Sequence, residues 1–133
     1  MPLWLDKLKT TFTRRPKPLG ARGEDTACRF LRNLGYKIIC RNFHCGVGEI
    51  DIIARDGKTL VFVEVKTRAY DDPTPEEQVN AAKQHQNTKA ATLYLARYGN
   101  ELPPARFDVL AIVWPHDGRP QVRHTIDAFA ATF

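Results

Sequence analysis

Three charged side chains interrupt two short apolar stretches in the middle of the chain. Asp51 lies in residues 48–55, and Glu64 and Lys66 lie in residues 58–68. Carboxylate oxygens are the ligands that Mg²⁺ prefers, and a neighbouring lysine can orient a water or offset charge on a phosphate. These residue types therefore indicate metal-assisted chemistry on a phosphate. The alternative is an exposed ion pair at a strand end, which would contribute little.

The two stretches are expected to pair with each other. An Asp-Gly pair at positions 56 and 57 separates them and predicts a β-hairpin. Because side chains alternate along a strand, Glu64 and Lys66 point to the same face. A turn with an even number of residues places Asp51 on that face too, whereas a shift by one residue would remove it. The predicted site therefore depends on the hairpin register.

A fourth acidic residue, Glu24, lies on a predicted helix at residues 20–34 that ends at Gly35. Glu24 falls on the inward side of this helix, one turn before its apolar stripe. A carboxylate on that side needs a partner, and a cation shared with the hairpin carboxylates would provide one. The alternative is a partly exposed glutamate stabilised by the helix dipole. The apolar stripe consists of Ala27, Leu31 and Leu34.

The order of helices and strands expected along the chain indicates an α/β domain. The hairpin and helix combine with three further strands and a second helix in the order α-β-β-β-α-β-(β), which predicts a mixed sheet flanked by helices. The added elements are a strand at 36–43, a helix from the capping box at 74–77 to about residue 98, a buried strand at 106–114 and an edge strand at 121–126.

Length and composition limit the class of protein. The 133 residues suit one domain, predicted at 20–133, preceded by an extension at 1–19 with a short amphipathic helix and a proline-rich basic linker. The sequence has no apolar run long enough to span a membrane and no signal-like start, so we expect a cytoplasmic protein. The cysteines are expected to be reduced; zinc ligation by Cys40, His44 and Cys45 is the alternative but lacks a fourth ligand.

Basic residues are concentrated early in the chain. Residues 1–41 contain ten Lys/Arg and three Asp/Glu, a distribution that suits a polyanion, although a solvated surface is the simpler interpretation. Arg22, Arg68 and Lys83 are the candidate nucleic-acid contacts. Two further acids are candidates for supporting roles. Glu49 shares the face of Asp51 and could be a metal ligand or a spectator, and Asp108 could orient a ligand or the lysine, or pair with Arg106.

These residues also resemble a known family. The motifs are Gly23-Glu24, Gly48-Glu-Ile-Asp-Ile-Ile-Ala-Arg55, Phe62-Val-Glu-Val-Lys-Thr-Arg68, Lys83-Gln84 and Arg106-Phe-Asp-Val109. Over about residues 20–129 they resemble the YraN family, uncharacterised protein family 0102. That family in turn resembles the PD-(D/E)XK nucleases, especially archaeal Holliday-junction resolvases, which implies a restriction-endonuclease-like core.

The resemblance implies roles for individual residues. Asp51, Glu64, the Val65 carbonyl and Glu24 would hold Mg²⁺ or Mn²⁺, and Lys66 would be the motif lysine. The expected function is a metal-dependent endonuclease acting on branched or structured DNA, with a homodimer expected by analogy. The alternative is a non-catalytic nucleic-acid-binding module on the same scaffold.

Overall fold

The computed structural model describes residues 17–131. Five strands form one sheet in the order β1-β2-β3-β4-β5. The elements are α2 (Leu19–Asn33), β1 (Lys37–Cys45), β2 (Gly48–Asp56), β3 (Thr59–Arg68), η1 (Pro75–Gln78), α3 (Ala81–Leu95), η2 (Ala96–Tyr98), β4 (Ala105–Val113) and β5 (Gln121–Thr125). The predicted α/β architecture and the order of its elements are confirmed.

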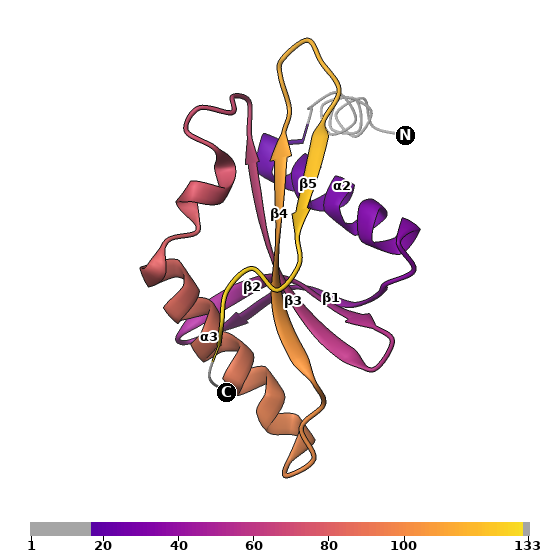
Figure 1. Ribbon diagram of the computed structural model, residues 1–133, viewed down its shortest axis with the longest axis vertical. Coiled ribbons are helices and arrows are strands. Elements are labelled where there is room, and N and C mark those ends of the chain that lie inside the picture. Colours follow the sequence, from indigo (N-terminus) through magenta and orange to yellow (C-terminus); the bar gives the residue numbers. More distant parts are fainter. Residues whose placement is uncertain (1–16, 132–133) are drawn as a thin grey trace, which may run out of the picture.

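The sheet is mixed, and α2 and α3 lie on opposite sides of it (Figure 1). β3 and β4 are parallel, while the other neighbouring strands are antiparallel. A parallel pair needs a long crossover, and η1 and α3 provide it. α3 is thereby packed against the face of the sheet opposite to α2.

Two apolar clusters fix the helices to the sheet. Beneath α2, Leu31 packs with inward residues of the central strands, and beneath α3, Tyr94 packs with Phe62 and Phe107. Strands buried on both faces read as continuous apolar runs. β4 follows this pattern, since its residues from Phe107 onward are all buried.

The first predicted helix is confirmed, but its apolar stripe is partly wrong. Ala27 and Leu31 are fully buried, whereas Leu34 is 52% exposed. α2 ends at Asn33, and Gly35 has a φ of 91°, a left-handed conformation that suits glycine. Leu34 is exposed because it lies beyond the last helical residue.

The prediction of a single helix from residue 74 to about 98 is wrong, because the structure has separate helices in this region. The capping box at Thr74 starts only the short helix η1, and the chain is interrupted at Val79. Asn80 then begins α3, because its side chain accepts a hydrogen bond from the backbone N–H of Lys83 at 3.0 Å. This second start determines which side chains of α3 face the sheet.

The hairpin turn contains an even number of residues, as the predicted site requires. Asp56 pairs with Thr59, so Gly57 and Lys58 form a two-residue turn, one position later than the Asp-Gly pair suggested. Gly57 adopts a φ of 59° and Lys58 has a negative φ, so the turn follows the type II′ pattern, with glycine as its first central residue. The even turn length places Asp51 on the side that the sequence predicted.

Two further predictions concern the N-terminal extension and membrane spans. The predicted amphipathic helix at 3–13 and most of the linker at 14–18 lie outside the described residues. Among residues 17–131, no helix combines the length and apolar character needed to cross a membrane.

Gly23 brings α2 into close contact with β3. A Cβ atom at this position would lie 1.8 Å from Thr67 Oγ1, and Thr67 is nearly buried. Threonine is stiff at χ1 and cannot move aside easily. The absence of a side chain at position 23 therefore sets the distance between Glu24 and the sheet.

We expect Gly23→Ala to destabilise the domain by about 1–3 kcal/mol, because the new methyl group must push α2 away from β3. Gly20→Ala is the matched control, since a Cβ there meets nothing within 4 Å. Helix propensity should leave that variant at least as stable as the parent chain. Urea denaturation measures both changes, and equal stability of the two variants would contradict the close contact.

Candidate functional site

The central feature of the site is a separation of β2 from β3. Their pairing extends from the turn to Ile52 and Val63 and then stops. β2 continues beside β1 to Gly48, and β3 continues beside β4 to Arg68. The sheet therefore opens between its two middle strands, leaving backbone groups at the opening without a strand partner.

Asp51 occupies this opening. Continuing the register would pair Ile50 with Val65, but the Val65 N–H instead donates to Asp51 Oδ2 at 2.8 Å. The Asp51 carboxylate thus takes the place of the next β2–β3 backbone hydrogen bond and accepts from the Val65 N–H. This bond fixes the carboxylate of Asp51 beside the neighbouring residue of β3, Glu64.

Glu64 points to the α3 side of the sheet and is 4% exposed. Lys83 Nζ lies 3.5 Å from Glu64 Oε1, and Asn87 Nδ2 donates to Glu64 Oε2 at 3.4 Å. Lys83 and Asn87 are one helical turn apart, so both reach the same carboxyl group. α3 thus supplies one cation and one neutral donor to a buried acid.

The two carboxyl groups strongly influence each other. Burial, followed by the charge of Asp51, raises the pKa of Glu64 from 4.5 to about 7 against the opposing charges of Lys83 and Lys66. Burial also raises the pKa of Asp51, although the Val65 N–H favours its charged form. A hydrogen bond between the carboxyl groups raises the pKa of Glu64 and lowers that of Asp51. Glu64 is therefore the member of the pair that retains a proton.

Glu24 approaches the same opening from α2. Its Oε1 is buried and has no hydrogen-bond partner among the described residues. Burial, followed by the charge of Asp51, raises the pKa of Glu24. Residues 17–131 contain no compact group of three His, Cys, Asp or Glu side chains that could hold a metal ion. Glu24 therefore lies at the margin of the Asp51–Glu64 pair.

Lys66 follows Glu64 by two residues on β3, which places it on the same face by strand alternation. Its charge lowers the pKa of Glu64. Asp51 and Glu64 lie within hydrogen-bonding reach of each other; that Lys66 shares their side of the hairpin stays a prediction.

The predicted nucleic-acid contacts have differing surroundings. Lys83 pairs with Glu64. Arg22 stacks its guanidinium 4.5 Å from the centre of the Trp114 ring, and Arg68 donates to Gln78 Oε1. Contact of these three residues with a phosphate stays a prediction.

Glu49 lies near the site but is partly exposed. Glu49 Oε2 is 3.1 Å from Nδ1 of the exposed His44, and its charge contributes to the raised pKa of Asp51. No described contact makes it a neighbour of Glu64. Its predicted supporting role stays a prediction.

Asp108 belongs to a separate buried cluster. Its carboxylate is fully buried and accepts from Arg106 Nε at 3.0 Å and from the Asp127 N–H at 3.0 Å. His124 Nε2 lies 2.7 Å from its Oδ2. Of the two predicted roles, the described contacts show the pairing with Arg106. They place Asp108 beside His124 of β5 rather than with Asp51 and Glu64.

Sequence reasoning missed two residues of the site. Asn87 is 2% exposed and bonds to Glu64; its signal was a polar residue four positions after Lys83 in mid-helix. Arg41 lowers the pKa of Glu24 and pairs with Asp25 at 2.9 Å, but nothing in its local sequence marked it.

The cysteines take no part in the site. Cys28, Cys40 and Cys45 are free thiols. Cys40 and Cys45 pack against the apolar cluster beneath α3. The zinc alternative through Cys40, His44 and Cys45 has no support within residues 17–131.

Comparison with known proteins identifies the family of this chain. The family described as "Uncharacterised protein family UPF0102" matches residues 23–112, which include the four predicted catalytic residues. The chain belongs to the UPF0102 family. A UPF0102 protein of Symbiobacterium thermophilum is 51% identical over 114 residues, covering 85% of this chain and 97% of the relative. A UPF0102 protein of Geobacter sulfurreducens is 49% identical over 118 residues, covering 88% and 92%. The predicted family is confirmed.

We expect Glu64→Gln to stabilise this UPF0102 domain at pH 8 in the presence of a chelator, by about 1–2 kcal/mol. The unfolded chain ionises Glu64 near 4.5, whereas the folded chain retains the proton to about 7. The folded state therefore binds more protons in this interval, and stability falls as pH rises through it. Glutamine removes the titrating group and flattens this slope.

Denaturant unfolding at several pH values measures this effect. Glu49→Gln is the matched control, because its side chain is 48% exposed and the substitution should change stability little. A Glu64→Gln variant with the pH dependence of the parent chain would show that Glu64 is not the buried acid described above.

Proposed function

We propose that this protein is a Mg²⁺- or Mn²⁺-dependent endonuclease that hydrolyses phosphodiester bonds in structured or branched DNA. The observation that carries the proposal is the pair formed by the half-buried Asp51 and the buried Glu64 at the opening of the sheet, with Lys66 two residues after Glu64 on β3. A structural ion pair does not need two acids whose pKa values are both raised by burial. Perturbed acids of this kind are typical of functional sites.

The residues present fit a divalent cation. Asp51 and Glu64 supply hard oxygen donors, which Mg²⁺ and Mn²⁺ prefer. Lys83 Nζ lies 3.5 Å from Glu64 Oε1, and its charge lowers the pKa of Glu64, so positive charge at this position favours the ionised carboxylate. Glu24 Oε1 is a buried acceptor with no described partner. These features support a cation held by Asp51, Glu64 and the Val65 carbonyl. Glu24 would have to move toward the cation to become a further ligand, because it forms no compact group of three with the two acids.

The side chains have distinct tasks in the proposed mechanism. When bound, the cation would polarise the phosphate and stabilise the leaving oxygen. Lys66 would orient the attacking water and offset charge on the phosphate. The Val65 N–H holds Asp51 in its charged form and in place. Lys83 and Asn87 position Glu64 from α3.

The test is cleavage of flap, four-way-junction and single-stranded DNA with Mg²⁺ or Mn²⁺. We expect Asp51→Asn, Glu64→Ala and Lys66→Ala each to lower the cleavage rate by at least about a hundredfold, as removal of an electrostatic catalytic group does. Lys58→Ala is the control, since this exposed lysine lies in the hairpin turn at the far end of β2 and β3.

Equal cleavage by all four variants would contradict the proposed roles. Salt-dependent DNA binding without metal-dependent turnover would favour the non-catalytic binding module instead. Calorimetric titration with Mn²⁺ separates the nuclease from a purely structural ion-pair cluster: no binding, or binding unchanged in Asp51→Asn, would favour the structural cluster.

A further inference from the structure

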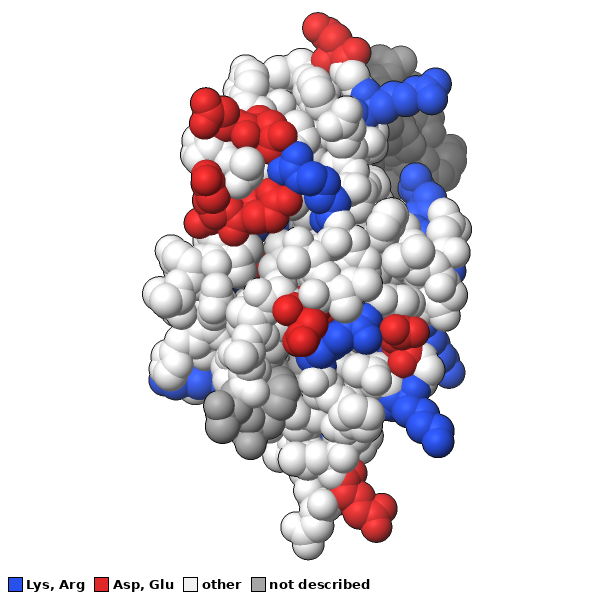
Figure 2. All heavy atoms as spheres, in the orientation of Figure 1, with Lys and Arg blue, Asp and Glu red and all other residues white. Residues whose placement is uncertain are grey.

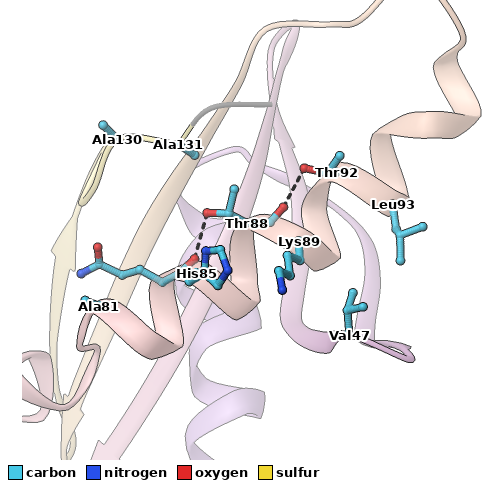
Figure 3. A pocket seen from close by; sticks show the side chains of 10 residues that line it. Val47, Ala81, His85, Thr88, Lys89, Thr92, Leu93, Ala130 and Ala131 are labelled. Carbon is cyan, nitrogen blue, oxygen red and sulfur yellow. Dashed lines mark hydrogen bonds between the residues drawn. The ribbon is translucent and has the colours of Figure 1, made fainter.

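A second surface feature lies next to the candidate site, on the outer side of α3 (Figure 3). It is a groove of about 800 Å³, bounded by Val47 of the β1–β2 turn and by Ala130 and Ala131 of the C-terminal segment. His85 and Lys89 of α3 lie along it. None of the mechanism above uses this groove.

The floor of the groove is largely apolar. Thr88 Oγ1 donates to the Gln84 carbonyl and Thr92 Oγ1 to the Thr88 carbonyl, each at 2.8 Å (Figure 3). Because both hydroxyls are bonded to their own helix, they offer a ligand little polar surface. Leu93 is 50% exposed and Val47 44% exposed at one end. The groove thus presents apolar surface that no described residue covers.

The charge around the groove has one sign. From Asn80 to Asn100 the sequence contains no Asp or Glu, but it contains Lys83, Lys89 and Arg97. The segment before α3 contains acidic residues instead, and Asp71 and Glu76 form ion pairs with Arg123. Figure 2 shows acidic side chains gathered around basic ones on one face of the molecule. A ligand of the groove must therefore be anionic along its length and apolar in part.

The groove and the candidate site are linked at the edge of α3. Lys83 and Asn87 face Glu64 and border a second hollow of about 440 Å³, which shares Val47 with the groove. His85 and Lys89 each follow one of these two residues by two positions, about 200° further round the helix, so they lie on its outer face. A chain leaving Glu64 would therefore pass Lys83 and Val47 and follow the edge of α3 into the groove.

We propose that this groove binds an unpaired strand of nucleic acid that leaves the candidate site, which rests on the nuclease function proposed above. A duplex presents its phosphates outward and keeps its bases stacked inside, so it cannot use an apolar floor. An unpaired strand exposes its bases to apolar surface while its phosphates meet Lys89 along the groove and Lys83 at the neighbouring hollow. The favoured substrate class is thus DNA or RNA with a single-stranded segment next to the cleaved bond.

The experiment measures binding of a fluorescein-labelled oligothymidylate and of a labelled blunt duplex by fluorescence anisotropy, with EDTA present so that neither is cut. We expect Lys89→Glu and Leu93→Asp each to weaken oligothymidylate binding by at least about fivefold, within the range for loss of one base or phosphate contact. Duplex binding should change by less than the same factor. Lys58→Glu is the control, because it makes the same charge change at an exposed turn outside the groove.

Oligothymidylate binding by Lys89→Glu and Leu93→Asp at the level of the Lys58→Glu control would overturn the groove as a strand-binding surface. Dissociation of a dimer by both variants would also overturn strand binding by the groove, because the groove would then be occupied by a second copy of this chain. Normal strand binding that depends on Lys89 and Leu93, combined with no cleavage by the parent chain in Mg²⁺ or Mn²⁺, would support the groove and overturn the nuclease function.

Discussion

The structure around the site depends on one electrostatic constraint, the placement of two poorly solvated carboxyl groups beside each other. Glu64 is buried and Asp51 is half-buried, and two like charges at short range cannot both be ionised without compensation. The protein compensates with a backbone N–H on Asp51, with Lys83 and Asn87 on Glu64, and with a retained proton on Glu64. A divalent cation would replace that proton with a stronger partner.

The fold creates this position by interrupting its own sheet. β2 stays with β1 and β3 stays with β4 beyond Ile52 and Val63, so the opening forms where the two middle strands separate. The crossover required by the parallel β3–β4 pair brings α3 to one side of the opening. Gly23 allows α2 to approach β3 closely on the other side. Helices on opposite faces can therefore contribute to one site.

The sequence predicted those parts that follow from local patterns. Alternation along the strands and the parity of a two-residue turn were enough to predict Asp51 beside Glu64, and the apolar run of β4 was recognised from its composition. The separation of β2 and β3 was not predictable, because it arises from strand pairing rather than from residue type. The break at Val79 was missed because the capping box at Thr74 resembled the start of the whole helix. Asn87 was missed because its burial depends on α3 packing against Glu64.

The most direct test of this account is a titration of the Glu64 carboxyl group by carbon-13 NMR, with and without Mg²⁺. The account predicts a pKa of about 7 without the cation and a value shifted well downward with Mg²⁺, because the cation favours the charged carboxylate. A titration of Glu64 near its ordinary value, or one that Mg²⁺ leaves unchanged, would contradict a buried acid pair poised to bind a cation.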